Sequence, residues 1–274
     1  MTALRRGNAG AAGGMGLVFV AMAVMTSAVA GPVLAQGDRG NPNWYVRFAP
    51  SAWFSNIDGA VTLGVGEDEQ IVGDFVLPVG DTLLVTDWAI RAEVGKGRWR
   101  ALMALAHSGV ANSGTFHRVS DPQIAETGNY NLDWLSAEVF AAVQVGPFRP
   151  ERGVEIYVGG RYVRIGQDVV VTGVSPIEAE ESWIDPVLGG RFFTEMGGPF
   201  WAMFNGDLGG WGVGSEFTLT LGGELGIRAG KSVDFTLRYS YQEFEYDNGK
   251  SGNDAFVWEN GAVQGWFLGL ALKY

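Results

Sequence analysis

The chain has 274 residues, carries a formal net charge of −11 and contains no cysteine. An acidic balance of this kind argues against nucleic acid as a partner, and the absence of cysteine excludes disulfides, thiolate metal sites and anchoring through a lipidated N-terminal cysteine. Beyond residue 35, no apolar run is long enough for a membrane-spanning helix.

The N-terminus has the layout of a secretory signal peptide, which we assign to residues 1–35. The only charges in this stretch are two arginines, and they precede an apolar run over 15–30 and a segment of small residues. A basic start, an apolar middle and small residues before the cut define such a leader. We predict cleavage after Ala35; a cut after Ala30 and a retained N-terminal anchor are the alternatives.

Without the two leader arginines, the 19 basic residues become 17, which against 30 acidic residues gives the mature chain a net charge of −13. We divide this mature chain into a short N-terminal segment, 36–43, and one domain, 44–274. An acidic surface of this kind suits a protein that faces the medium through acidic loops.

Ten stretches of the domain show the period-two alternation of a strand with one apolar face. In one of the clearest, Phe217, Leu219 and Leu221 alternate with Thr218 and Thr220. The predicted strands are 44–57, 82–95, 98–111, 130–146, 152–172, 181–196, 199–212, 216–229, 232–247 and 266–274.

The connections between these stretches alternate in length. Those near 96–97, 146–152, 197–198 and 230–231 are short, whereas those at 58–81, 112–129, 173–181 and 248–260 are longer and more polar. Only the connection near 212–215 is brief in the second set. Short periplasmic turns and long external loops are typical of an outer-membrane barrel. The segment 58–81 leaves an alternative open, because Asp58-Gly59 favours a hairpin. Residues 60–66 with 70–79 could form a hairpin above the membrane or supply two more wall strands.

The C-terminus has the pattern of a lipid-facing barrel strand. Large apolar side chains fall on every second position and the last residue is aromatic, and these residues are Trp266, Leu268, Leu270, Leu272 and Tyr274. At about 3.3 Å per residue and a tilt of about 40°, this strand covers roughly 20 Å of height, close to the apolar band of an outer membrane. We predict an all-β fold, a transmembrane antiparallel up-and-down barrel of about ten strands, with twelve or eight as alternatives.

Applying the alternation to every strand places a set of charges inside the barrel. They are Asp87, Arg91, Glu93, Glu138, Glu155, Arg161, Asp185, Arg191, Asp207, Glu224, Arg228, Asp234 and Arg238. Charges in a narrow space must pair, so we expect arginine–carboxylate contacts across the lumen. These contacts either hold and fill the barrel or line a thin path for ions, which Phe140, Tyr157 and Phe193 would narrow further.

Aromatic side chains are predicted to form two belts at the membrane interfaces. The periplasmic belt would contain Trp44, Trp99, Phe148, Trp201 and Tyr274, and the external belt Trp53, Trp183, Trp211 and Trp266.

The chain resembles the small outer-membrane β-barrel proteins of Gram-negative bacteria, the superfamily of the OmpA and OmpW barrels. More narrowly, it is similar to a group of uncharacterised barrels through Trp-x-x-x-Ile-Asp-Gly at 53–59, Trp-x-Asp-Pro-x-x-Gly-x-Arg at 183–191 and Asp-x-Gly-Gly at 207–210. The resemblance spans most of 44–274. It implies insertion by the outer-membrane assembly machinery through the terminal aromatic strand, and it implies no chemistry.

Two groups of residues around the histidines raise the hypothesis of a catalytic site. His107 with Asn112 and Ser113 has the residue types of an outer-membrane phospholipase, but the spacing departs from that family. His117 with Asp121 and Asp133 could activate water as in a ten-stranded protease, but no distinctive pairing singles them out. Both groups are more simply loop and rim residues, so we predict no catalytic site.

The acidic runs 67–69 and 178–181 could recruit calcium or bridge lipopolysaccharide through divalent ions. They lack the fixed spacing of a calcium loop, and we expect an acidic exterior, no metal site and no cofactor.

The predicted function is a non-enzymatic outer-membrane barrel, structural or a narrow channel. The alternative is a surface-exposed adhesin-type barrel that acts through loops 58–81, 112–129 and 248–260, and an outer-membrane hydrolase is a remote third. The expected partners are outer-membrane lipid, lipopolysaccharide and the assembly machinery, with no nucleic acid; the oligomeric state is left open.

Overall fold

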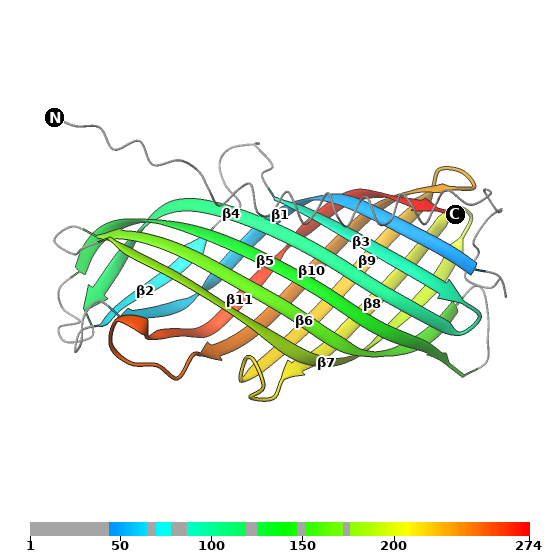
Figure 1. Ribbon diagram of the computed structural model, residues 1–274. Helices are drawn as coiled ribbons and strands as arrows, with labels where there is room; N and C mark the ends of the chain where they lie inside the picture. Colours follow the sequence, from blue (N-terminus) through cyan, green and yellow to red (C-terminus); the bar gives the residue numbers. More distant parts are fainter. Residues whose placement is uncertain (1–43, 65–69, 78–86, 119–124, 147–151, 172–175) are drawn as a thin grey trace.

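The computed structural model describes residues 44–64, 70–77, 87–118, 125–146, 152–171 and 176–274 (Figure 1). The predicted leader 1–35 and the segment 36–43 lie outside these residues. The strands are β1 (Trp44–Gly64), β2 (Gln70–Leu77), β3 (Trp88–Lys96), β4 (Trp99–Arg118), β5 (Ala125–Val145), β6 (Arg152–Val171), β7 (Ile177–Gly197), β8 (Phe200–Gly210), β9 (Phe217–Arg228), β10 (Val233–Asp247) and β11 (Phe256–Lys273), with a short 3₁₀ helix, η1 (Gly252–Asp254), before β11.

The strands form one antiparallel sheet that closes on itself, because β1 pairs with β11. β2 and β3 run in the same direction and both pair with β1 and β4, β2 along the second half of β1 and β3 along its first half. Together they occupy a single place in the wall. The predicted closed barrel of ten strands is therefore confirmed.

Residues 60–64 pair antiparallel with 70–74, as the predicted hairpin of 60–66 with 70–79 requires, but Asp58-Gly59 does not form a turn. Both residues lie inside β1, where the register against β11 shifts between Asp58 and Ala60. Gly59 has a φ of +144°, and a Cβ there would overlap the indole of Trp258. The glycine therefore marks a bulge under a large side chain rather than a turn. Residues 58–64 and 70–77 lengthen wall strands and add no eleventh or twelfth one.

The exterior of the wall changes character along the strands. We call the end where β1 begins and β11 ends the terminal end, and the opposite end the distal end. On β5, outward side chains from Val145 to Leu135 are apolar, and Val139 is 63% exposed, whereas Asp133 begins a polar stretch. Ten strand steps at about 3.3 Å and a tilt of about 40° give an apolar band roughly 25 Å high.

Several strands continue well beyond this band. β5 and β7 have 21 residues each, and β4 and β6 have 20. A strand of that length covers roughly 50 Å of barrel height, about twice the apolar band. The result is an elongated barrel (Figure 1). The outward side chains of its distal half are mainly polar.

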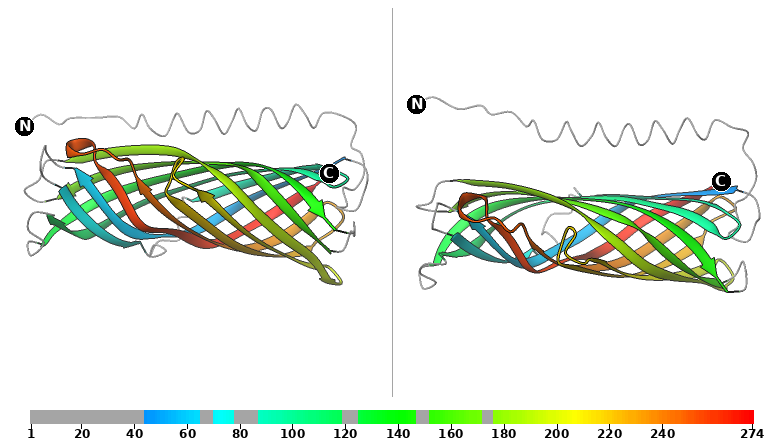
Figure 2. Two further views of the ribbon diagram at one scale, coloured as in Figure 1. Left: turned by 90° about the horizontal axis from the view of Figure 1, so that it is seen from below. Right: turned by 60° about the horizontal axis from the view of Figure 1, so that its bottom comes forward.

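The wall is low on one side. β8 and β9 have only 11 and 12 residues, and the turn that joins them lies well short of the distal end (Figure 2). β7 pairs with β8 only from Val187 onward, so the preceding part of β7 is paired on one side alone. Pro186, which has no N–H to donate, lies at the point where this pairing stops.

The interior of the distal half is packed with apolar side chains. We call this cluster the distal core; it consists of Trp53, Ile57, Val61, Leu63, Ala89, Tyr130, Leu132, Trp134, Val163, Ile165, Val169, Val171, Trp183, Phe244, Tyr246, Phe256, Trp258, Val263 and Phe267. The interior of the terminal half is mainly polar and charged, with Phe193, Trp201 and Met203 as a smaller apolar cluster.

Candidate functional site

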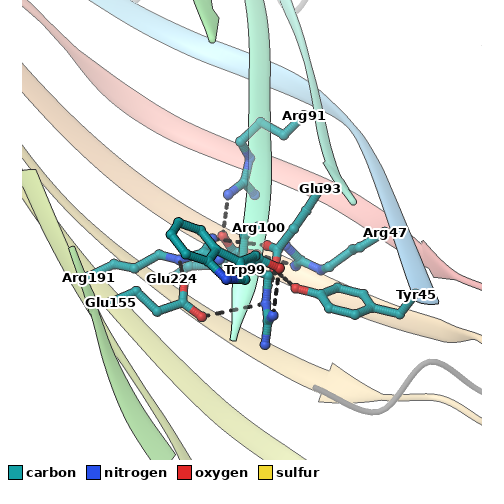
Figure 3. A network of polar contacts seen from close by, with 9 residues as sticks. All are labelled: Tyr45, Arg47, Arg91, Glu93, Trp99, Arg100, Glu155, Arg191 and Glu224. Atoms are coloured by element: carbon teal, nitrogen blue, oxygen red, sulfur yellow. Dashed lines mark hydrogen bonds and ion pairs between the residues drawn. The ribbon is translucent and has the colours of Figure 1, made fainter. Parts of the chain in front are cut away.

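The charged interior of the terminal half is the candidate site. Figure 3 shows its central part, where side chains from six strands converge. Glu224 on β9 accepts hydrogen bonds from two arginines, Arg47 at 2.7 Å through Oε1 and Arg91 at 2.5 Å through Oε2. The carboxylate is 2% exposed, so two guanidinium groups replace its lost hydration. Arg47 also lies over the ring of Trp201, 5.1 Å from its centroid.

A second group of ion pairs lies beside the first (Figure 3). Arg191 on β7 donates to Glu155 at 2.5 Å and to Glu93 at 2.9 Å. Arg100 lies 3.6 Å from Glu155 and 3.8 Å from Glu93, and Tyr45 donates to Glu93. All five groups are buried, which makes this a network of mutually neutralised charges in a site with little water.

A third group lies on the wall formed by β5 to β8. Arg161 on β6 is fully buried and donates to Glu138 at 2.6 Å and to Asp207 at 2.9 Å. Tyr157 donates to the second oxygen of Asp207 at 2.9 Å. The three groups together contain the arginine–carboxylate contacts that the alternation led us to expect in the lumen.

Five of the predicted interior charges lie outside these groups. Asp87 accepts from Ser55, from Ser108 and from the backbone N–H of Gly109. Asp185 accepts from Trp183 and from Ser215. Neither aspartate has an arginine partner among the described residues, because hydroxyl, indole and backbone N–H donors satisfy its oxygens instead.

Two more of these five charges lie near the terminal end. Asp234 pairs with Lys273 at 2.8 Å and accepts from Trp201 at 3.1 Å. Arg228 pairs with Glu195 at a half-exposed position, so it takes no part in the buried network. The remaining predicted residue, Arg238, lies over the ring of Phe267 and lines a cavity at mid-height.

Of the thirteen predicted charges, eight are buried: Glu93, Glu155, Arg161, Asp185, Arg191, Asp207, Glu224 and Asp234. Our sequence reasoning missed Arg47, Arg100 and Tyr45, which belong to the network. Arg47 and Tyr45 share the face of β1 that carries the buried Ala49, so strict alternation from Tyr45 would have found them. Arg100 lies in the predicted strand 98–111, whose faces cannot be told apart by alternation because residues 102–106 are apolar on both faces.

Three tryptophans assigned to the interfacial belts lie inside the barrel instead. Trp53 is 4% exposed, Trp183 is 6% exposed and Trp201 is 7% exposed. Trp183 is two residues before the inward Asp185, so the alternation places it on the inner face. The belt prediction used only height along the strand and neglected the face. Trp44, Trp99, Trp211, Trp266 and Tyr274 are exposed on the exterior.

The geometry gives little support to the two catalytic hypotheses that involve His107 and His117. His107 lies on the outer face of β4, where Nε2 is 2.9 Å from Asp133, and its ring stacks against Trp88. Asp133 also accepts from Arg164 at 3.4 Å, so its contacts form an exterior ion cluster on the wall. Ser108, the next residue, points inward. The side chains of Asn112, Ser113 and His117, and the whole of Asp121, lie outside what the structure describes.

Within the described part of the chain, no group of three or more histidine, aspartate or glutamate side chains is placed to hold a metal. The acidic run 67–69 lies outside that part. In the run 178–181, Glu181 accepts from Asn248 at 2.7 Å and from Tyr246 at 3.3 Å. No helix among the described residues is long and apolar enough to cross a membrane.

A closed antiparallel barrel with an apolar exterior band and a charged interior defines the class to which this fold belongs, the bacterial outer-membrane β-barrels. No protein-family model matches the chain, and no curated protein matches it.

Solved structures of this class do match. The outer-membrane protease OmpT from Escherichia coli is similar with a TM-score of 0.50 and 8% identity, over 89% of this chain and 99% of that one. The translocator domain of the autotransporter NalP from Neisseria meningitidis matches with a TM-score of 0.39 and 10% identity, over 96% and 97% of the two chains. Ail from Yersinia pestis matches with a TM-score of 0.35 and 8% identity, over 85% and 99%. At this identity the OmpT likeness concerns the fold alone, and the lower scores carry no argument.

Proposed function

We propose that the protein is a non-enzymatic barrel of the bacterial outer membrane whose lumen is closed and whose role is structural. The apolar band, roughly 25 Å high, would lie in the lipid, with the terminal end in the periplasm and the distal half outside the cell. Export through the leader 1–35 and insertion by the outer-membrane assembly machinery are parts of this proposal. Membership of the OmpA and OmpW superfamily remains a prediction.

One observation carries the proposal: aromatic contacts cross the lumen in the distal core. Phe244 on β10 is fully buried, and its ring centroid lies 5.3 Å from Trp134 on β5, 5.3 Å from Trp258 and 6.1 Å from Trp183. β5 and β10 lie five places apart in a wall of ten, so the Phe244–Trp134 contact spans the bore. A layer of contacting aromatic rings leaves little room for water along the bore at this level.

The ionic network supplies a second level of closure. Arg191 on β7 reaches Glu93 on β3, and Arg91 on β3 reaches Glu224 on β9, so these pairs also cross the interior. A hydrated path would have to pass both levels. This arrangement favours a structural barrel over the narrow channel that the interior charges alone had left open.

Planar-bilayer conductance tests the proposal. Protein purified from outer membranes should give no discrete current steps, because both levels obstruct the bore. Phe244→Ala is the informative variant, since it removes the ring that joins three others. Discrete steps in the wild type, enlarged by this variant, would contradict the closed lumen and support a narrow channel.

Surface interaction is the second candidate, favoured by the wall that continues beyond the apolar band. The outer faces of its distal part carry an excess of acid, with Asp168, Glu178, Glu180, Glu243 and Glu245 against Arg164. Replacing 249–255 by one glycine would leave Asn248 in a tight Asn-Gly turn, shorten one projecting connection and keep the contact of Asn248 with Glu181. If the protein is an adhesin acting through this loop, expressing cells should lose attachment to a host-cell layer; unchanged attachment would contradict that role.

A further inference from the structure

A cavity of about 140 Å³ lies at mid-height in the lumen, between the ionic network and the distal core. Its lining includes five arginines, Arg47, Arg91, Arg161, Arg191 and Arg238, and aromatic side chains from the distal core. A space of this size accommodates several waters, or one small ion with fewer. The lining is therefore rich in positive charge for its size.

Arg238 differs from the other arginines of this lining. Its guanidinium lies over Phe267, 5.2 Å from the ring centroid, and Phe267 stacks on Trp53 with centroids 5.2 Å apart and planes 7° apart. Such stacking fixes the plane of the cation. Its polar contact is a hydrogen bond to Ser240 at 3.3 Å, and no carboxylate lies within ion-pair distance of it among the described residues.

The carboxylate opposite Arg238 is already engaged. Arg238 and Glu224 are direct cross-strand partners on β10 and β9. Both oxygens of Glu224 accept from other arginines, Arg47 and Arg91. The stacked guanidinium is thus held beside a neutralised acid, and its own charge has no protein partner in the described interior.

The charges around the cavity do not balance. The three ion-pair groups contain the carboxylates Glu93, Glu138, Glu155, Asp207 and Glu224 and the arginines Arg47, Arg91, Arg100, Arg161 and Arg191. With Arg238, six positive charges face five negative ones. Asp87 and Asp185 accept from hydroxyl, indole and backbone N–H donors, and Asp234 pairs with Lys273. Arg238 is therefore the one lining arginine without an ion-pair partner among the described residues.

The unpartnered polar atoms of the lining also indicate that a negatively charged acceptor is missing. Arg238 Nε, Arg91 Nη2 and Arg161 Nη1 are buried N–H donors without an acceptor, as are Trp53 Nε1 and Gln242 Nε2. Among the described lining residues, no carboxylate oxygen is both buried and without a donor. Buried donors are costly without an acceptor, and an acceptor with negative charge would also compensate the partly buried guanidinium of Arg238.

We propose that this cavity binds one small monovalent anion, of halide size, between Arg91, Arg161 and Arg238. A single negative charge matches the single unpaired guanidinium, and an anion accepts several N–H donors at once. Water in the same place would satisfy the donors but leave the charge uncompensated. The site does not depend on whether the barrel is structural, adhesive or conducting.

Thermal unfolding of the purified full-length protein tests the site, with sodium held constant and gluconate replaced stepwise by bromide. Gluconate is too large for the cavity. The midpoint should rise saturably, by about 3–6 °C at ten times the dissociation constant. Arg238→Gln should abolish the rise, whereas Arg228→Gln, which alters the half-exposed pair with Glu195, should keep it. A rise that persists in Arg238→Gln would overturn the proposal.

Crystals of the wild-type protein grown in sodium bromide decide the question if Arg238→Gln does not fold. An anomalous peak in the cavity, within hydrogen-bond distance of Arg238, is the expected result. A cavity that contains only water, with no bromide-dependent rise in the unfolding midpoint, would overturn the proposal.

Discussion

Arg191 illustrates, at the scale of one residue, how the lumen keeps its charges buried. Its guanidinium joins Glu93 and Glu155, which come from β3 and β6, so a single side chain bridges three places in the wall. A buried ion pair adds little over apolar packing, but removing one partner leaves an uncompensated charge. The main effect of Arg191 is therefore to compensate the charges of Glu93 and Glu155, and its net contribution to the free energy of folding is small.

Arg191→Ala should destabilise the barrel by about 3–5 kcal/mol, because two buried carboxylates lose their closest cationic partner. Urea unfolding, with heat-dependent gel mobility as a second readout, measures the effect. The matched control is Arg228→Ala, whose half-exposed pair with Glu195 should cost no more than about 1 kcal/mol. Equal stability of Arg191→Ala and the wild type would show that the ion pairs of Arg191 do not contribute to the stability of the barrel.

The faces of individual residues could be predicted wherever alternation was unambiguous. The inner placement of Phe140, Tyr157 and Phe193 followed from it, and each is at most 7% exposed. Trp183 and Trp53 were misassigned because an aromatic near a membrane interface was read by its height alone. The partner of each charge was not predictable, since Arg47 and Glu224 are 177 residues apart.

At the scale of one element, the first half of β7 is paired with a strand on one side only. Side-chain contacts stabilise its other side. Trp183 stacks on Tyr246 of β10 with centroids 4.0 Å apart, and Glu181 accepts from Tyr246 and from Asn248. These contacts join β7 to β10 across the low wall of β8 and β9. The charged Glu178 and Glu180 on the same stretch also discourage pairing with another chain.

Trp183→Ala should loosen this part of the wall, at a cost of about 3–5 kcal/mol for a buried ring. Hydrogen exchange should rise in 177–186 and around Tyr246, while the backbone of the terminal half stays protected. Trp99→Ala removes a ring that is 67% exposed and provides the control. If exchange in 177–186 stayed at the wild-type level, the backbone pairing with β6 alone would suffice.

At the scale of the whole molecule, the barrel depends on the seam between its first and last strands. β1 pairs with β11 over most of its length, and Val46 and Tyr274 exchange both backbone hydrogen bonds, at 3.0 and 2.9 Å. These bonds close the sheet at the terminal end. A closed sheet has no unpaired edge, which is the condition for a barrel to lie in lipid.

Deleting Lys273 and Tyr274 should reduce the amount of folded barrel several-fold, because it removes the last bonds of the seam and the terminal aromatic. Tyr274→Phe keeps the backbone bonds and the ring, so it should assemble like the wild type. The heat-modifiable fraction in outer-membrane preparations measures both. Normal assembly of the deletion variant would contradict a role for the terminal residues in closure.

By itself, the amino-acid sequence determined the strand period, the closed barrel of ten strands and the inner face of most charges, because alternation and turn spacing are local properties. The tertiary structure alone decided that β2 and β3 share one place in the wall, that Asp58-Gly59 lies in a bulge and that Phe244 meets Trp134 across the bore. It also decided which guanidinium is left without a carboxylate. These features depend on shear and on contacts across the lumen, which bring together side chains far apart in the chain.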